Sequence, residues 1–231
     1  MNRCRSTALA LFLALAGRAG GVPCAAAASG AAGDGPAVGS AAKPPLRSSK
    51  LPAAAKAAIE RARLFRYVLR RPAKPSGETL ILLHGSGGDE TTLLPLAARI
   101  APNSVLMGVA GRVTQDGKKR WYERITPVAF VQADVRGEAD AFADFIARQA
   151  HAEGIDLDRA TFLGYSNGAN LIAALALLHP GLVERAVLLR PMPVLEKIPA
   201  VNLARTAVLT VTGASDAVYA PFGPALQAIL R

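Results

Sequence analysis

The chain has 231 residues, of which 51% are hydrophobic, and its formal net charge is +10. The excess charge lies near the N-terminus: residues 1–75 hold 13 Lys and Arg against 2 Asp and Glu, whereas the remaining residues hold 14 against 15. The part that can bury a core is therefore nearly neutral, and no basic helix face with interleaved aromatic residues follows residue 75. This pattern argues against a nucleic-acid-binding protein and favours one soluble domain.

The first 28 residues have the features of an export signal. Arg3 and Arg5 precede the apolar run "ALALFLALA" at 8–16, which is too short to span a bilayer as a mature helix, and "CAAAA" at 24–28 offers a cleavage site. We therefore expect a signal peptide over residues 1–28 and a periplasmic or secreted protein, with no stable membrane insertion once the signal is removed. The alternative is a misassigned start codon, in which case the protein is cytoplasmic.

Residues 29–63 are rich in Ala, Gly and Pro, and we expect a flexible linker there. The globular domain is then expected over residues 64–231. Residues 56–71 alternatively read as a basic amphipathic helix on a membrane surface, although a short tether followed by an edge strand is the simpler interpretation. Both cysteines, Cys4 and Cys24, fall in the expected signal, which leaves the domain without a disulfide or a cysteine-based metal site.

From residue 79 onward, short apolar runs alternate with longer amphipathic ones. Continuously apolar strands are covered on both faces, so a mostly parallel sheet with helices on both faces is expected, an α/β fold. Pro95 is compatible with a helix only in its first turn. Strands are predicted at 65–69, 79–85, 104–111, 160–166, 186–190 and 207–213, helices at 89–100, 133–153, 168–179 and 221–230, and a long polar and aromatic loop at 112–130.

Ser166 is the first candidate site residue. It stands between Gly164 and Gly168 in "TFLGYSNGAN", after an apolar strand and before an apolar helix. A G-x-S-x-G pattern in this context presents a nucleophilic serine on a sharp strand-to-helix turn, and the glycines let strand and helix approach closely. An ordinary serine at such a turn is the alternative interpretation.

A glycine-rich segment, "HGSGGDE" at 84–90, follows the strand at 79–85. The backbone N–H groups of Ser86 and Asn167 are the expected pair of donors for an oxyanion hole. A glycine-rich turn without a ligand is the alternative, and a phosphate loop is disfavoured because G-K-[ST] is absent. Asp216, after the strand at 207–213, follows the serine in the order expected of a triad acid, or else caps the next helix.

Four segments together resemble the phospholipase/carboxylesterase group of the α/β-hydrolase superfamily, close to dienelactone-hydrolase-like enzymes. They are "LLHGSGGDE", "RVTQDGKKRWYER", "FLGYSNGANL" and "VTGASDAVYAPF". The resemblance implies Ser166 as nucleophile, Asp216 as acid, and Ser86 and Asn167 as oxyanion donors. It implies no metal and no cofactor, and a small-molecule ester as the substrate. Trp121 and Tyr122 resemble residues that line the substrate pocket, although a buried anchor for their loop is an equal alternative.

The resemblance also implies a catalytic histidine downstream of Asp216, and no histidine follows His179. His179 is about 20 Å from Ser166 along the predicted helix and is better interpreted as its C-terminal cap. His151 is expected to be solvated, and His84 to support the oxyanion loop. We therefore expect a hydrolase fold that lacks its last strand and helix, through a truncated or frameshifted gene. A catalytically inactive binding protein on the same fold is the alternative.

Overall fold

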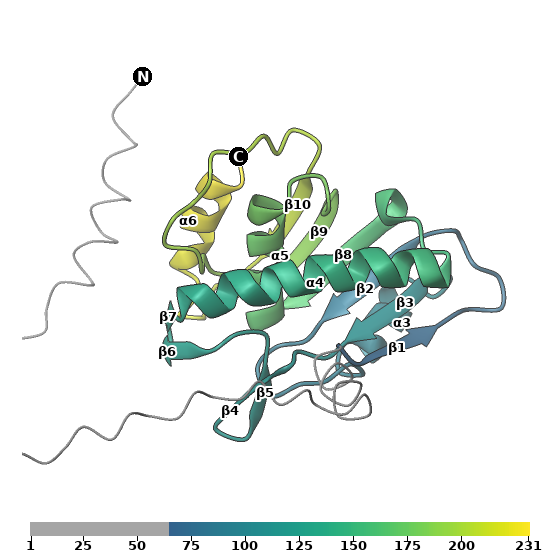
Figure 1. Ribbon diagram of the computed structural model, residues 1–231, viewed down its shortest axis with the longest axis horizontal. Helices are drawn as coiled ribbons and strands as arrows, with labels where there is room; N and C mark the ends of the chain where they lie inside the picture. Colours follow the sequence, from purple (N-terminus) through teal and green to yellow (C-terminus); the bar gives the residue numbers. More distant parts are fainter. Residues whose placement is uncertain (1–64) are drawn as a thin grey trace, which may run out of the picture. The chain divides into compact units, whose positions relative to one another are not determined.

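The computed structural model describes residues 65–231. The signal expected over residues 1–28, the linker expected over residues 29–63 and both cysteines lie outside the described residues. In the described part a central sheet is packed against helices (Figure 1). None of the helices within residues 65–231 combines the length and the apolar character that a bilayer span requires.

The sheet has six strands and is parallel except at one edge, where β1 runs antiparallel to β3. Its spatial order is β1-β3-β2-β8-β9-β10, so the direction of the chain across the sheet reverses at β2. Leu83 at the end of β2 lies beside Gly164 near the end of β8. The loops that leave these two strands therefore start side by side, at the kind of switch point where α/β sheets bind ligands. The strands are β1 (Tyr67–Arg70), β2 (Thr79–Leu83), β3 (Val105–Val109), β8 (Ala160–Tyr165), β9 (Arg185–Leu189) and β10 (Ala207–Val211).

Helices cover both faces of the sheet, as expected from the apolar strands. The cores of α4 (Gln132–Glu153), α5 (Asn167–Leu178) and α6 (Phe222–Ile229) join one large apolar cluster, and Figure 1 shows α4 lying across this face. A smaller cluster on the other face contains buried residues from α3 (Leu94–Ile100) and its preceding turn. Every residue of α5 up to Leu177 is buried, which confirms that this helix is enclosed.

The first helix of this set begins later than the sequence predicted. A helix was expected over 89–100, but α3 starts at Leu94 and carries Pro95 in its first turn. Asp89 explains the difference, because its carboxylate accepts hydrogen bonds from the backbone N–H of Thr91 and the hydroxyl of Thr92. These local bonds hold residues 89–92 in a turn that competes with the helix.

The segment predicted as a loop over 112–130 contains two small antiparallel sheets. In the first, β4 (Val113–Gln115) pairs with β5 (Lys118–Arg120). In the second, β6 (Arg124–Thr126) pairs with β7 (Ala129–Phe130). The turn of the first hairpin has Asp116 and Gly117 at φ values of 52° and 68°, the left-handed pair that a tight hairpin turn requires.

The last strand, β10, is an edge of the sheet, as expected for the strand at 207–213. Its Leu209 and Val211 pair in register with Val187 and Leu189 of β9, which belong to the margin of the smaller cluster. The side chains of Leu209 and Val211 are 58% and 46% exposed. The α3 side of the sheet therefore presents apolar surface at this edge.

Candidate active site

One pocket collects residues from the carboxyl ends of the strands and from the 112–130 segment. It encloses about 310 Å³ of space, part of it open to solvent. Three of the four residues expected in the catalytic machinery line it: Ser86, Ser166 and Asn167. The complete lining is Ser86, Arg120, Arg124, Pro127, Phe130, Ser166, Asn167, Asn170, Met192 and Tyr219.

Ser166 occupies a strained turn between β8 and α5. Its φ and ψ are 48° and −110°, a conformation that costs a residue with a Cβ about 1–3 kcal/mol. Its backbone N–H donates to the carbonyl of Leu189, which ties the turn to the neighbouring strand. Its hydroxyl neither caps α5 nor hydrogen-bonds to any other described residue. The turn thus holds an unengaged hydroxyl at the pocket.

The two flanking glycines are required by close packing. A Cβ at Gly164 would lie 2.7 Å from the Cα of Ala169, and a Cβ at Gly168 would lie 2.2 Å from the carbonyl oxygen of Leu83. Both contacts involve backbone atoms, which cannot rotate away. The G-x-S-x-G pattern therefore reflects the crossing of β8, α5 and β2, as its interpretation from the sequence required.

The N–H groups of Ser86 and Asn167 donate to no other described residue. Asn167 is the first residue of α5, where backbone N–H groups are unpaired and the helix dipole favours negative charge. Its side-chain oxygen accepts a hydrogen bond of 2.8 Å from the backbone N–H of Trp121, which fixes the residue. Two residues with unused backbone donors therefore line the same pocket as Ser166, a set of groups able to bind an oxyanion.

Asp216 lies beyond β10 and is not among the residues that line the pocket. Its carboxylate accepts hydrogen bonds from the Nε of Arg190 at 2.5 Å and from the backbone N–H of Tyr219 at 3.1 Å. The Arg190 guanidinium holds the pKa of Asp216 below its ordinary value. Tyr219 does line the pocket. Asp216 is therefore hydrogen-bonded to a lining residue without lining the pocket itself.

Trp121 and Tyr122 are both fully buried and neither lines the pocket. The indole N–H of Trp121 donates to the carbonyl of His84, and the hydroxyl of Tyr122 donates to the carbonyl of Asn167. Their positions agree with the buried-anchor alternative: they fasten the 112–130 segment beneath the expected oxyanion loop.

His84 is 1% exposed and has both ring nitrogens engaged. Nε2 accepts a hydrogen bond from the backbone N–H of Gly111, so Nδ1 carries the proton and donates to the carbonyl of Gly85. Burial lowers its pKa below the ordinary value. This neutral, doubly bonded ring supports the loop, as expected, and has no nitrogen free for Ser166.

The other two histidines lie away from the pocket. His179 is the C-cap of α5, and its Nε2 is 2.9 Å from a carboxylate oxygen of Asp140 on α4. His151, in the last turn of α4, is exposed. No described histidine therefore hydrogen-bonds to Ser166 or Asp216. Within residues 65–231, no group of three or more His, Cys, Asp or Glu side chains converges as a metal site requires.

Sequence reasoning missed three arginines near the pocket. Arg120 and Arg124 line it, and Arg190 stacks on the ring of Tyr219, with 3.8 Å between the guanidinium carbon and the ring centroid. Arg120 and Arg124 bracket the two aromatic residues in "KRWYER". The pocket is therefore lined by the neighbours of Trp121 and Tyr122, and the two rings are buried anchors instead.

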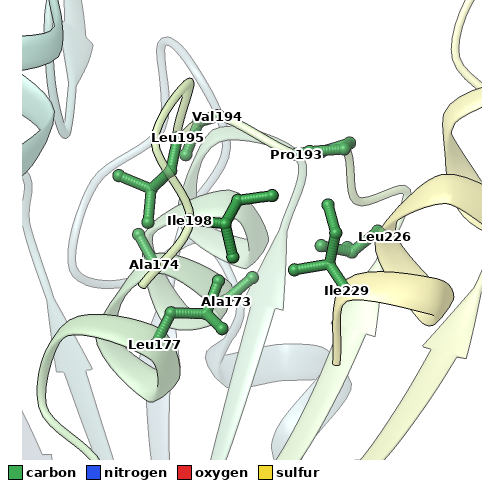
Figure 2. Close-up of a pocket in the computed structure, with 9 residues that line it drawn as sticks. All are labelled: Ala173, Ala174, Leu177, Pro193, Val194, Leu195, Ile198, Leu226 and Ile229. Carbon is green, nitrogen blue, oxygen red and sulfur yellow. The ribbon is translucent and has the colours of Figure 1, made fainter. Parts of the chain in front are cut away.

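A second hollow, of about 230 Å³, lies between α5, α6 and the segment after β9 (Figure 2). Its lining side chains come from Ala, Leu, Ile, Val and Pro only. It therefore carries no group that can perform chemistry.

Comparison with known proteins identifies the fold family. No family model matches the chain. The crystal structure of a carboxylesterase from Mesorhizobium loti is 54% identical, covers 72% of this chain and 79% of its own, and superimposes with a TM-score of 0.70. The "Putative hydrolase MhqD" of Bacillus subtilis is 33% identical over 141 residues, which are 61% of this chain and 70% of that protein.

The chain belongs to the α/β-hydrolase superfamily, in the group that contains these carboxylesterases. A Bacillus cereus carboxylesterase of this group is 27% identical, with a TM-score of 0.69 over 75% of this chain and 82% of its own. The mostly parallel sheet with helices on both faces is the fold that these hydrolases share with this chain. Membership of this family supports hydrolase activity for the chain. The pocket at the carboxyl ends of the strands is where an enzyme of this fold is expected to have its active site.

Proposed function

We propose that this α/β-hydrolase is a serine carboxylesterase acting on small-molecule esters. The hydroxyl of Ser166 attacks the acyl carbon, and the alcohol leaves with a proton. Water then attacks the acyl-enzyme and releases the acid. The N–H groups of Ser86 and Asn167 hold the negative charge on the carbonyl oxygen during both steps. Asp216 is the candidate triad acid, whose role would be to orient a histidine, and no metal or cofactor takes part.

One observation carries the proposal: a strained turn holds the free hydroxyl of Ser166 in the same pocket as two residues whose N–H groups donate to nothing else described. Strain of this kind persists only where the surrounding structure enforces it, and it gathers at functional sites. The carboxylesterase relatives support an ester bond as the one that is cleaved.

A specific observation favours a second function. In the described structure both nitrogens of His84 are engaged, His151 and His179 lie elsewhere, and the Asp216 carboxylate is paired with Arg190. A serine without its histidine loses about 10⁴–10⁶ in turnover. The second candidate is therefore a catalytically inactive binding protein that keeps the pocket.

The experiment that tests the proposal combines a fluorophosphonate probe with p-nitrophenyl acetate. Labelling at Ser166 that is absent from Ser166→Ala, together with slow release of p-nitrophenol, supports the serine esterase. A folded chain that shows neither supports the binding protein. Turnover at ordinary enzyme rates that His84→Ala abolishes, while the variant keeps its fold by circular dichroism, would assign the base to His84 instead.

A further inference from the structure

Arg120 is a buried cation in the wall of the pocket. Its side chain and backbone together are only 3% exposed, yet it belongs to the lining. Its Nη1 donates to the hydroxyl of Ser86 at 2.8 Å. Its Nε is buried and has no hydrogen-bond partner in the described structure. Burying a guanidinium with an unused donor lowers the stability of the fold unless a bound acceptor hydrogen-bonds to that donor.

No described carboxylate forms an ion pair with Arg120, in contrast to other arginines of the domain. Arg190 pairs with Asp216, and Arg112 pairs with Glu138. What lies near Arg120 is instead a second cation, Arg124, which lines the same pocket. Burial, and then the positive charge of Arg124, lowers the pKa of Arg120. The carboxylate of Asp116 opposes this effect from a distance, but no ion pair with Arg120 or Arg124 is present in the described structure. Two like charges that lack an ion-paired carboxylate make the pocket attractive to an anion.

We propose that Arg120 and Arg124 form an anion-binding subsite and that the substrate is a small ester carrying a second, negatively charged carboxylate or phosphate group. Guanidinium groups match both anions with their planar set of donors. Because Arg120 contacts Ser86 directly, the charged group of the ligand lies within a few bonds of the ester. The ester part rests on the proposed function, whereas the anion site stands on the arginines alone.

Binding by isothermal titration calorimetry tests the subsite without any need for turnover. The full chain carrying Ser166→Ala is titrated with monomethyl glutarate, with 2-acetoxyethyl phosphate and with the neutral dimethyl glutarate. At least one of the two anionic esters is expected to bind roughly tenfold tighter than the neutral diester, with the preferred one identifying carboxylate or phosphate. Equal binding of all three, or no measurable binding of either anion, overturns the proposal.

Variants distinguish an arginine that binds the anion from one that only stabilises the fold. Arg124→Gln in the Ser166→Ala background is expected to remove most of the preference for the anion, whereas Arg99→Gln is a control that removes one exposed charge from α3. Arg120→Gln is interpreted only if its thermal midpoint shows a folded chain, because Arg120 also holds Ser86. An anion preference that survives Arg124→Gln unchanged, or that Arg99→Gln reduces equally, refutes the site.

The two proposals fail separately. Fluorophosphonate labelling of Ser166 without an anion preference leaves the esterase and removes the subsite. An anion preference without labelling leaves the subsite and removes the esterase.

Discussion

The carboxylate of Asp216 accepts a hydrogen bond from Nε of Arg190 at 2.5 Å, where β9 and β10 end. Arg190 reaches this position with a φ of 56°, and its backbone N–H donates to the carbonyl of Val211. The residue expected to orient a histidine is thus held by a guanidinium that also stacks on the pocket wall at Tyr219. Any base that uses Asp216 must share its carboxylate with this guanidinium or displace it.

Removing the guanidinium should change the titration of Asp216. Arg190→Gln is expected to raise the pKa of Asp216 toward its ordinary value, because the bond to Arg190 is the main cause of its low pKa. Since that pKa is lower in the folded than in the unfolded chain, the contact stabilises the fold above the ordinary pKa of aspartate, and this contribution is lost as pH falls through the folded value. Carboxyl NMR titration measures the shift. Arg205→Gln, which breaks the separate pair with Glu184, is the control and should leave Asp216 unchanged.

The crossing of β8, α5 and β2 should not tolerate a methyl group. Gly168→Ala is expected to destabilise the fold by about 3 kcal/mol or more, because the new Cβ meets the backbone of Leu83. Urea denaturation measures the change. Gly137→Ala in α4 is the matched control: a Cβ there meets nothing within 4 Å, so stability should stay equal or rise by up to about 1 kcal/mol. Similar losses in both variants would contradict the proposed tight crossing.

His84 should make the stability of the domain depend on pH below neutrality. Its folded pKa is lowered by burial, so the unfolded chain binds a proton first as pH falls below about 6.5. Its contribution is complete above that pH and is lost progressively down to the folded pKa. His84→Gln is expected to cost about 1–3 kcal/mol at pH 8 and to flatten this slope. Urea titrations between pH 8 and 5.5 measure the slope, and a slope in His84→Gln as steep as in the wild type would contradict the assignment.

The edge strand β10 should promote association between copies. Leu209 is 58% exposed on a strand with a free edge, and lysine at such a position opposes edge-to-edge pairing. Leu209→Lys is therefore expected to lower light scattering at a given concentration while changing stability by less than about 1 kcal/mol. Ile125→Lys, at an exposed apolar residue on a hairpin away from this edge, should have little effect. An equal reduction in both would indicate general solubility rather than strand pairing.

The strand, turn and helix around Ser166 could be predicted because several local features of the sequence indicate the same structure. The apolar run of β8, the glycines at 164 and 168, and the wholly apolar α5 all specify one local geometry. The mostly parallel sheet followed from the continuously apolar strands, whereas their spatial order is seen only in the structure. The start of α3 was misplaced because the side chain of Asp89 competes locally with helical hydrogen bonds.

The lining of the pocket was harder to predict than its nucleophile. Arg120 and Trp121 are adjacent, and both are buried, but only the arginine lines the pocket. Which of two neighbours points inward depends on the hairpins of the 112–130 segment, whose pairing is set by contacts with distant residues such as His84 and Asn167. Local sequence patterns do not contain those contacts. The guanidinium partner of Asp216 was missed for the same reason.

His84 joins two carbonyl-end loops through opposite sides of one ring, accepting from Gly111 and donating to Gly85. The segment that carries the Ser86 amide is thereby braced to the exit of β3 before any ligand arrives. If the amide binds an oxyanion as we propose, it needs no reorientation when negative charge develops on a bound carbonyl, because its position is already set by folding.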